Sequence, residues 1–182
     1  MFAEQGFDTV PVTAIAKAAG VSHMTFFRHF PTKEAVVVAD MFDPLIAEAV
    51  RAQPRRWRPL TRAVRGLIAA MDRESAREEM SSREFRDRIR LAARTPSLSA
   101  AARAASQETE RAIAEALIVP GVDDAAARAA AGAVMGATTS LLLVWAGENN
   151  APEAGATGTA TSTDGDAVTV LSRGLLSLLG ES

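Results

Sequence analysis

The segment from Thr13 to Glu34, TAIAKAAGVSHMTFFRHFPTKE, most constrains the fold, because it describes two short helices joined by a tight turn. Ile15, Ala16 and Ala19 lie at i, i+1 and i+4, which places them on one face of the first helix. Gly20 is well suited to end that helix, since the left-handed backbone of a helix terminus costs glycine least. We therefore predict a small apolar seam on the first helix and a turn that begins at Gly20.

The second helix of this segment exposes more hydrogen-bonding groups around one turn than a core helix of this length usually does. We expect Val21 to enter the core, Ser22 to cap the helix, and Phe26 and Phe30, at i and i+4, to face inward. The side chains left for the other faces are His23, Met24, Thr25, Phe27, Arg28 and His29. This arrangement is typical of a helix-turn-helix motif, whose second helix enters the DNA major groove while the first braces it on the backbone.

The longer run GFDTVPVTAIAKAAGVSHMTFFRHFPTKEAVV resembles the DNA-binding head of the TetR family of bacterial transcriptional regulators. The order and spacing of the matching elements make the resemblance specific. They are Gly6-Phe7, Ile15-Ala16, Ala19-Gly20-Val21-Ser22, Thr25, Phe26-Phe27, Phe30-Pro31 and Lys33-Glu34. The resemblance implies an all-α fold, with residues 1–43 forming the helix-turn-helix head and the start of a linking helix, and residues 44–182 forming a helical bundle for effector binding and dimerisation.

The same resemblance implies a function and a set of DNA contacts. The protein would be a cytoplasmic regulator, most simply a repressor, that binds double-stranded operator DNA as a homodimer and is released by a small apolar effector. The residues expected to contact DNA are Thr13, Ser22, His23, Met24, Thr25, Phe27, Arg28, His29 and Lys33. His23 and Met24 would face base edges, and Lys33 would bind a backbone phosphate. The plainer alternative is that Arg28 and Lys33 are solvated charges and His23 is an ordinary surface residue.

Three departures from the family pattern predict weaker DNA binding. Phe27 stands where the family usually has a phosphate-binding Tyr, and this chain has no Tyr. Pro11 stands where Thr or Ser usually caps the first helix of the motif, although Thr13 could compensate. Only MFAEQ represents the helix that precedes GFDTV, so we expect this first helix to be truncated, with Met1 internal to a longer natural helix. A TetR-like fold with impaired DNA binding, acting as an interaction or ligand-binding protein, is therefore the alternative function.

Charge and composition favour a DNA-binding head on an acidic body. Residues 1–65 carry nine Lys and Arg against six Asp and Glu, whereas the remainder carries 11 against 16. There is no cysteine, and His23 and His29 are the only imidazoles, so we expect neither a metal site nor a cofactor. No nucleophile–base pair or phosphate-binding glycine loop indicates an enzyme. Because MFAEQG has neither a basic n-region nor an apolar h-region, we expect no secretory signal.

The rest of the chain divides into helices at proline, glycine and capping residues. We expect helices to start at Thr32, Pro59, Ser81 or Ser82, Thr95-Pro96, Asp123-Asp124 and Asp166, with an interruption at Asp43-Pro44. Residues 149–164, rich in Gly, Ala, Thr and Ser, predict a loop. The arginines at positions 55, 56, 58, 62 and 65 are interpreted as a solvated surface, with a nucleic-acid patch as the rival interpretation.

The segment from Ala129 to Gly147 contains no charged residue. It could be a core helix or, with Gly132 and Gly136 as a GxxxG pair, a membrane span. Its mainly Ala, Gly and Thr composition and the lack of a basic flank at its end favour a core helix and no membrane partner. In the resembled family the last two helices pair with those of a second subunit. The residues expected at this dimer interface are Gly132, Gly136, Leu141, Leu171, Leu175 and Leu178.

The effector pocket is the least specific of these predictions. Candidate lining residues are Leu67, Met71, Met80, Phe85, Ile89, Leu98, Met135 and Trp145, although ordinary core packing is the simpler interpretation of each one taken singly. Met and Trp together suit an adaptable apolar pocket. Through Arg90-Leu91, Thr95-Pro96, Leu98 and ERAIAEAL, the body also resembles a TetR subgroup thought to bind acyl-coenzyme A-like molecules. An apolar, acylated effector is the expectation that follows.

Overall fold

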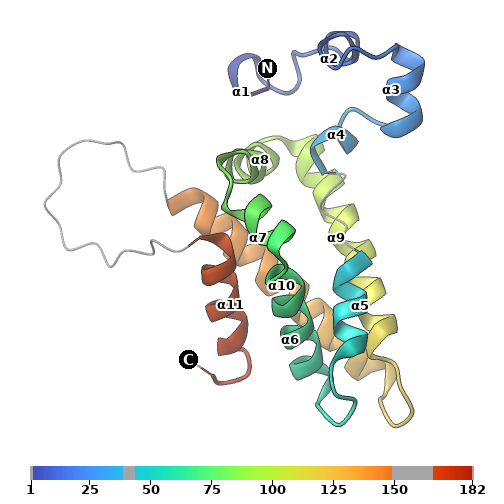
Figure 1. Cartoon of the computed structure of the whole chain (residues 1–182), viewed down its shortest axis with the longest axis vertical. Coiled ribbons are helices and arrows are strands. Elements are labelled where there is room, and N and C mark those ends of the chain that lie inside the picture. Colours follow the sequence, from blue (N-terminus) through green and yellow to red (C-terminus); the bar gives the residue numbers. More distant parts are fainter. Residues whose placement is uncertain (1, 39–43, 149–165, 182) are drawn as a thin grey trace, which may run out of the picture.

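The computed structural model describes residues 2–38, 44–148 and 166–181, and all regular structure in these ranges is helical. The all-α prediction is thereby confirmed. A small head holds α1 (Phe2–Gln5), α2 (Val12–Ala18), α3 (His23–His29) and α4 (Ala35–Val38), and it sits at one end of a longer helical body (Figure 1). The helices of the body are α5 (Pro44–Ala52), α6 (Pro59–Met71), α7 (Glu74–Ser81), α8 (Arg83–Arg94), α9 (Pro96–Leu117), α10 (Asp124–Glu148) and α11 (Ala167–Ser177).

Local capping chemistry sets the ends of the helices in the head. Gly20 adopts a positive φ of 68° after α2, as predicted for this turn. The Ser22 hydroxyl accepts a hydrogen bond from the Thr25 amide at 3.1 Å, and so caps α3. The Thr32 hydroxyl accepts one from the Ala35 amide at 3.2 Å. The long helix expected after Thr32 is described only as α4, because residues 39–43 lie outside the described ranges.

The packing of the turn differs from the prediction at Val21. Its side chain is 39% exposed, so the expectation that it enters the core is wrong. Val21 lies in the turn itself, where its amide donates to the Ala16 carbonyl at 2.9 Å. The head buries Val10, Ala16 and Phe26 instead. The α2 seam is correspondingly narrow, because Ala19 is exposed as well.

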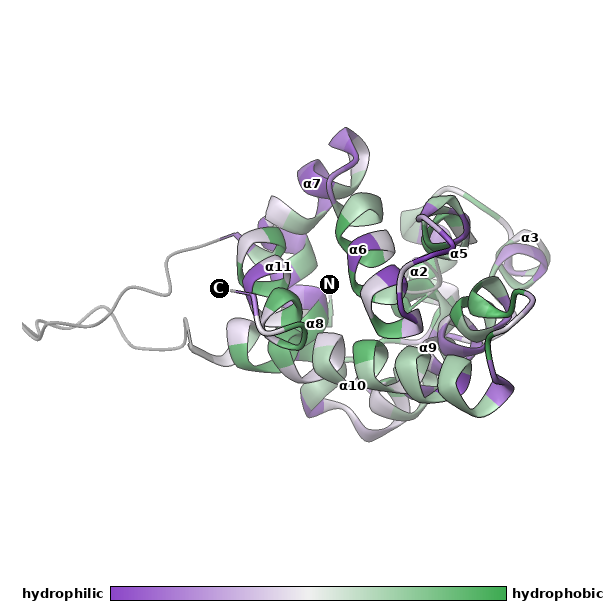
Figure 2. Cartoon of the chain, turned by 90° about the horizontal axis from the view of Figure 1, so that it is seen from below, coloured by the Kyte–Doolittle hydropathy of each residue, from purple (hydrophilic) through white to green (hydrophobic). Residues whose placement is uncertain are grey.

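The body is organised around one main apolar core to which α5, α6, α9, α10 and α11 contribute. Figure 2 shows the hydrophobic sides of α6, α9 and α10 turned toward one another. The predicted starts at Pro59, Asp123 and Asp166 are confirmed, and Ser82 caps α8 through the Phe85 amide at 3.0 Å. Helix α7 was not predicted, because ESAREEMS has no apolar periodicity, and none of its residues is buried. The expected loop at residues 149–164 lies outside the described ranges.

Arg62 is a buried guanidinium, which corrects its interpretation as part of a solvated surface. Its side chain lies within the bundle at 1% exposure and donates to the carbonyls of Leu117 at 3.0 Å and Ala116 at 3.2 Å. These are carbonyls at the C-terminal end of α9 that have no partner further along the helix. Burial, followed by repulsion from Arg55, lowers the pKa of Arg62. Arg55, Arg56 and Arg58 are exposed, as expected.

Helices α5 and α6 approach each other closely at a glycine. A Cβ atom placed on Gly66 would lie 2.6 Å from the Val50 Cα, which is closer than real side chains approach a backbone. Gly66 and Val50 are both buried. The absence of a side chain at Gly66 therefore sets the separation of these two helices.

A second apolar cluster joins the head to the body. We call it the junction cluster, and it consists of the buried residues Phe7, Val37, Val38, Ala92 and Leu98. Phe7 and α4 come from the head, whereas Ala92 and Leu98 lie on either side of the corner between α8 and α9. The corner between α8 and α9 is therefore in direct packing contact with the head.

Helix α10 has the length and apolarity of a membrane-crossing helix, with a mean hydropathy of 1.6 over an 18-residue stretch within Asp124–Gly147. It nevertheless lies within the bundle, where it packs against α6, α8, α9 and α11. Ala127, Ala131 and Val134 on its inner side are fully buried. One side of α10 thus belongs to the core, and its opposite side is exposed.

Candidate DNA-binding face and effector cavity

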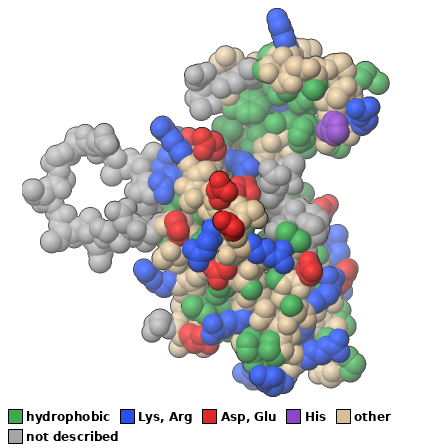
Figure 3. Space-filling model, in the orientation of Figure 1, with side chains coloured by type: hydrophobic (Ala, Val, Ile, Leu, Met, Phe, Trp, Pro, Cys, Tyr) green, Lys and Arg blue, Asp and Glu red, His purple; other side chains and the backbone are tan. Residues whose placement is uncertain are grey.

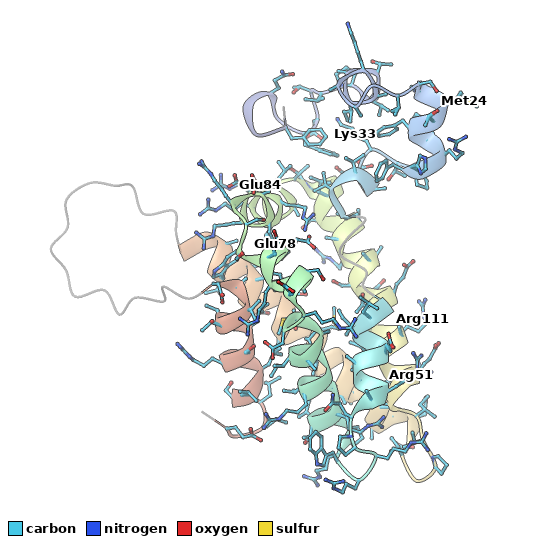
Figure 4. All side chains as sticks on the ribbon, viewed as in Figure 1. Met24, Lys33, Arg51, Glu78, Glu84 and Arg111 are labelled. Carbon is cyan, nitrogen blue, oxygen red and sulfur yellow. The ribbon has the colours of Figure 1, made fainter. Side chains whose placement is uncertain are left out.

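Helix α3 presents a mixed polar and apolar face to solvent. His23, Arg28 and His29 are exposed, Met24 is 80% exposed and Phe27 is 37% exposed. Figure 3 shows a histidine next to basic side chains on the edge of the head that carries α3, and Figure 4 shows Met24 on its outer side. A helix with bare donors and an unburied methionine at one end of the molecule has the accessibility that a major-groove helix requires.

Two of the predicted contact residues are partly committed to the helix itself. The hydroxyls of Ser22 and Thr25 lie 2.9 Å apart, and the Ser22 oxygen also caps the helix. Thr25 is half-buried. The edge of the His23 ring meets the Phe27 ring with centroids 4.7 Å apart, and Phe27 meets Phe26 at 5.4 Å. These contacts hold His23 and Phe27 in defined positions on the outer face of α3.

Lys33 is turned inward in this structure. Its ammonium group donates to the Phe7 carbonyl, approaches the Asp8 carbonyl at 3.4 Å, and lies 4.4 Å from the centre of the Phe7 ring. It lies on the inner side of the head in Figure 4. Lys33 therefore holds the segment after α1 against α4. Thr13, by contrast, is exposed on α2.

The body contains a half-open cavity of about 610 Å³. Six of the eight predicted pocket residues line it: Leu67, Met71, Met80, Phe85, Ile89 and Met135. They come from α6, α7, α8 and α10, so the fold brings together residues that are up to 68 positions apart in sequence. The lining is mainly apolar, as is usual for small-molecule sites.

The remaining two predicted pocket residues lie elsewhere. Leu98 is fully buried in the junction cluster. Trp145 packs against Phe85 with ring centroids 6.0 Å apart, and the Arg86 guanidinium covers it at 4.4 Å. Trp145 thus supports the cavity wall from behind through Phe85 and does not line the cavity.

Several polar residues line the cavity that the sequence did not single out. The Arg88 guanidinium forms an ion pair with Glu79 and lies 5.3 Å from the centre of the Phe85 ring. Arg103, Gln107 and Glu110 line it from α9. Arg88 could have been found by periodicity, because it lies three residues after Phe85 and next to Ile89 on the same side of α8. No local pattern marks the α9 residues as cavity residues.

The residues predicted for the dimer interface fall into two groups. Leu171 and Leu175 are buried inside the protomer, and Leu141 packs against Gly174, where a Cβ would lie 2.6 Å from the Leu141 Cδ1. Gly132 and Gly136 instead line the cavity, which the buried Leu171 also reaches. Of the six residues, Leu178 is the most exposed large side chain, at 41%. The uncovered side of α10 is what we call the α10 stripe: Ala129, Ala133, Gly136, Ser140, Leu143 and Val144.

Two family models match this chain and together account for both of its parts. Residues 1–39 match the N-terminal domain model of the bacterial regulatory proteins of the tetR family. Residues 57–163 match the model of the MftR C-terminal domain. The chain belongs to the TetR family. The first match covers the helix-turn-helix head, and the second spans α6 to α10 together with residues outside the described ranges.

A curated relative agrees with this membership in the TetR family. The chain is 32% identical over 118 residues to the HTH-type transcriptional regulator TcmR of Streptomyces glaucescens. That alignment covers 60% of this chain and 50% of TcmR, so the chain spans about half the length of this relative. The resemblance first inferred from the run ending in FPTKE is thus confirmed for the family.

Proposed function

We propose that this TetR-family chain is a repressor that binds operator DNA as a homodimer and is released by a small apolar effector. The observation that carries the proposal is the exposed face of α3, where His23, Met24 and Arg28 are free to approach base edges. A cytoplasmic location, without a membrane partner, a cofactor or catalysis, goes with this role. Residues 1–43 would act as the DNA-binding unit and residues 44–182 as the effector-binding and dimerisation unit.

The proposed DNA contacts differ in kind. Met24 and His23 would meet base edges, and Arg28 would reach guanine or phosphate. Thr13, Phe27 and His29 would flank the groove, while Ser22 and Thr25 would mainly keep the first turn of α3 in shape. Lys33 would bind a phosphate only after exchanging its contacts with the Phe7 and Asp8 carbonyls, so its present arrangement supports a positioning role in the free protein.

The cavity supports the effector part of the proposal. Its volume of about 610 Å³ falls within the range of roughly 300–1,000 Å³ that is usual for small-molecule sites. Its floor is apolar, and the Arg88–Glu79 pair at one edge supplies charge. An apolar tail with a polar end, such as an acylated molecule, fits this distribution.

The link from cavity to DNA would run through the corner between α8 and α9. Ala92 belongs to the junction cluster and Ala102 packs against it, and both residues also line the cavity. An effector that pushes on these two small residues would shift Leu98 and the head that packs on it. Because packed cores switch between discrete arrangements, a small shift there can change the spacing of two heads.

The α10 stripe supports the homodimer. Its residues are small or apolar and carry no charge, and Leu143 and Val144 are 46% and 52% exposed. A dimer with two heads would read two half-sites related by symmetry. In vitro selection from random duplex DNA tests this: an enriched inverted repeat is expected, and enrichment of single half-sites or of nothing would contradict the proposal.

A ligand-binding protein with impaired DNA binding is the second candidate. It is favoured by the inward position of Lys33 and by Phe27, which has no hydroxyl for a phosphate. The same selection experiment separates the two candidates, because this alternative predicts that no sequence is enriched while a ligand still binds the cavity.

A further inference from the structure

Glu110 brings a carboxylate to the wall of a mainly apolar cavity. The residue belongs to α9, is half-buried and lines the cavity. Its carboxylate forms no hydrogen bond or ion pair with any other residue that the structure describes. Taking a charged group out of water costs free energy unless a partner compensates it. A half-buried carboxylate beside a cavity is therefore placed to take that partner from a ligand.

The neighbouring helix leaves room for this carboxylate at Gly132. A Cβ atom placed on Gly132 would lie 3.3 Å from Oε1 of Glu110 and 3.8 Å from its Cδ. The shorter of these distances is tighter than an ordinary van der Waals contact. Gly132 itself lines the cavity from α10. The glycine thus lets the Glu110 carboxylate lie against α10 at the wall of the cavity.

The arginines around the cavity do not neutralise Glu110 by contact. Arg88 forms its ion pair with Glu79, and Arg128, one turn before Gly132, pairs within α10. Arg103 lines the cavity but is exposed, and it lies seven residues before Glu110, about 10 Å along the helix axis. This separation exceeds the Debye length of about 8 Å at physiological salt, so their attraction is largely screened.

We propose that Glu110 binds a positively charged amino group of the effector, so that the ligand is an amphiphilic cation. This inference rests on the effector site proposed above and assigns a charge to the polar end of its ligand. An ammonium group has three donors, and a carboxylate accepts them in charge-assisted hydrogen bonds. The apolar part of the ligand lies along Met71, Met80 and Met135, whose flexible thioether side chains adapt to its shape.

The test compares decylamine, decanol and decanoic acid, which share one alkyl chain and differ in the charge of the end group. Isothermal titration calorimetry on the full chain measures each affinity. We expect the wild type to bind decylamine at least tenfold more tightly than decanol, and decanoic acid most weakly. Glu110→Gln keeps the shape of the side chain, and should lose this preference while binding decanol as the wild type does. Glu108→Gln is the matched control, because Glu108 is exposed on the same helix and does not line the cavity.

The outcomes separate this inference from the proposed function. A wild type that binds decanol or decanoic acid as tightly as decylamine overturns the cationic ligand but leaves the apolar effector site standing. A wild type that binds none of the three overturns both. A folded Glu110→Gln variant that still prefers decylamine overturns the role of Glu110. If Glu110→Gln does not fold, Glu110→Lys decides the matter, because it should bind decanoic acid more tightly than decylamine, and an unchanged order would overturn the inference.

Discussion

Replacing Gly66 by alanine should destabilise the body, because this glycine sets the contact between α5 and α6. The new Cβ would meet the Val50 Cα and Cγ2 at 2.6 Å and the Val50 amide nitrogen at 2.8 Å. Ordinary van der Waals contacts between carbon atoms lie at about 3.5–4.0 Å. Two of the three atoms are backbone, so the side chain cannot turn away and the helices must separate by roughly 1 Å.

The magnitude follows from two opposing effects. Overpacking a well-packed core costs about 1–3 kcal/mol, and the upper end applies because the clash is with backbone. Alanine in a helix interior regains about 1 kcal/mol over glycine. The net loss in the free energy of unfolding is therefore about 2 kcal/mol, which for a chain of this length lowers Tm by about 4–8 °C.

Thermal unfolding followed by circular dichroism, at fixed protein concentration, measures this loss. Gly147→Ala is the control, because nothing lies within 4 Å of a Cβ at that helical position. We expect Gly147→Ala to leave Tm unchanged or slightly higher. A Gly66→Ala variant at least as stable as the wild type would refute the close approach of α5 and α6.

Three further predictions follow from individual residues. Arg62→Met should lower the free energy of unfolding, measured by urea titration, by about 2 kcal/mol, because two buried carbonyls at the end of α9 lose their hydrogen-bond donor. This loss outweighs the gain from no longer burying a guanidinium, and unchanged stability would contradict the cap on α9. Ala92→Phe should weaken operator binding even without effector, because the larger side chain fills the corner of the cavity next to the junction cluster. Fluorescence anisotropy on operator DNA measures the binding, and Tm shows whether the variant remains folded. Hydrogen bonding to Thr169 lowers the pKa of Asp166. The carboxylate therefore stabilises the fold above the unfolded-state pKa, and this stabilisation is lost as pH falls through the folded-state pKa. Asp166→Ala should lower the free energy of unfolding by about 1 kcal/mol at neutral pH and leave it unchanged in acid.

Features determined by neighbouring residues were predictable from the sequence. Gly20, Ser22 and Pro59 set helix ends through chemistry confined to one turn, and the structure has these ends where they were expected. The exposed face of α3 was also predictable, because Phe26 alone commits one side of so short a helix to the core.

Features that depend on how distant helices cross were not predictable. Leu98 and Leu67 are equally apolar, but only Leu67 lines the cavity, and nothing local distinguishes them. Arg62 is buried because the end of α9, 54 and 55 residues further on, offers it two carbonyls. Lys33 turns inward because the carbonyls of a segment 25 and 26 residues earlier lie within its reach.

The central claim is that the outer face of α3 binds operator DNA, and a salt series of fluorescence anisotropy tests it most directly. The measurement compares the wild type, Arg28→Ala and Arg111→Ala on duplex DNA that flanks the gene and on scrambled DNA; Arg111 is an exposed arginine on α9 in the body. We predict that the wild type and Arg111→Ala prefer the flanking DNA, with affinity falling steeply as salt rises. Arg28→Ala should bind more weakly by about 1–3 kcal/mol, or with a salt slope reduced by about one. Equal binding by the wild type and Arg28→Ala would contradict the account.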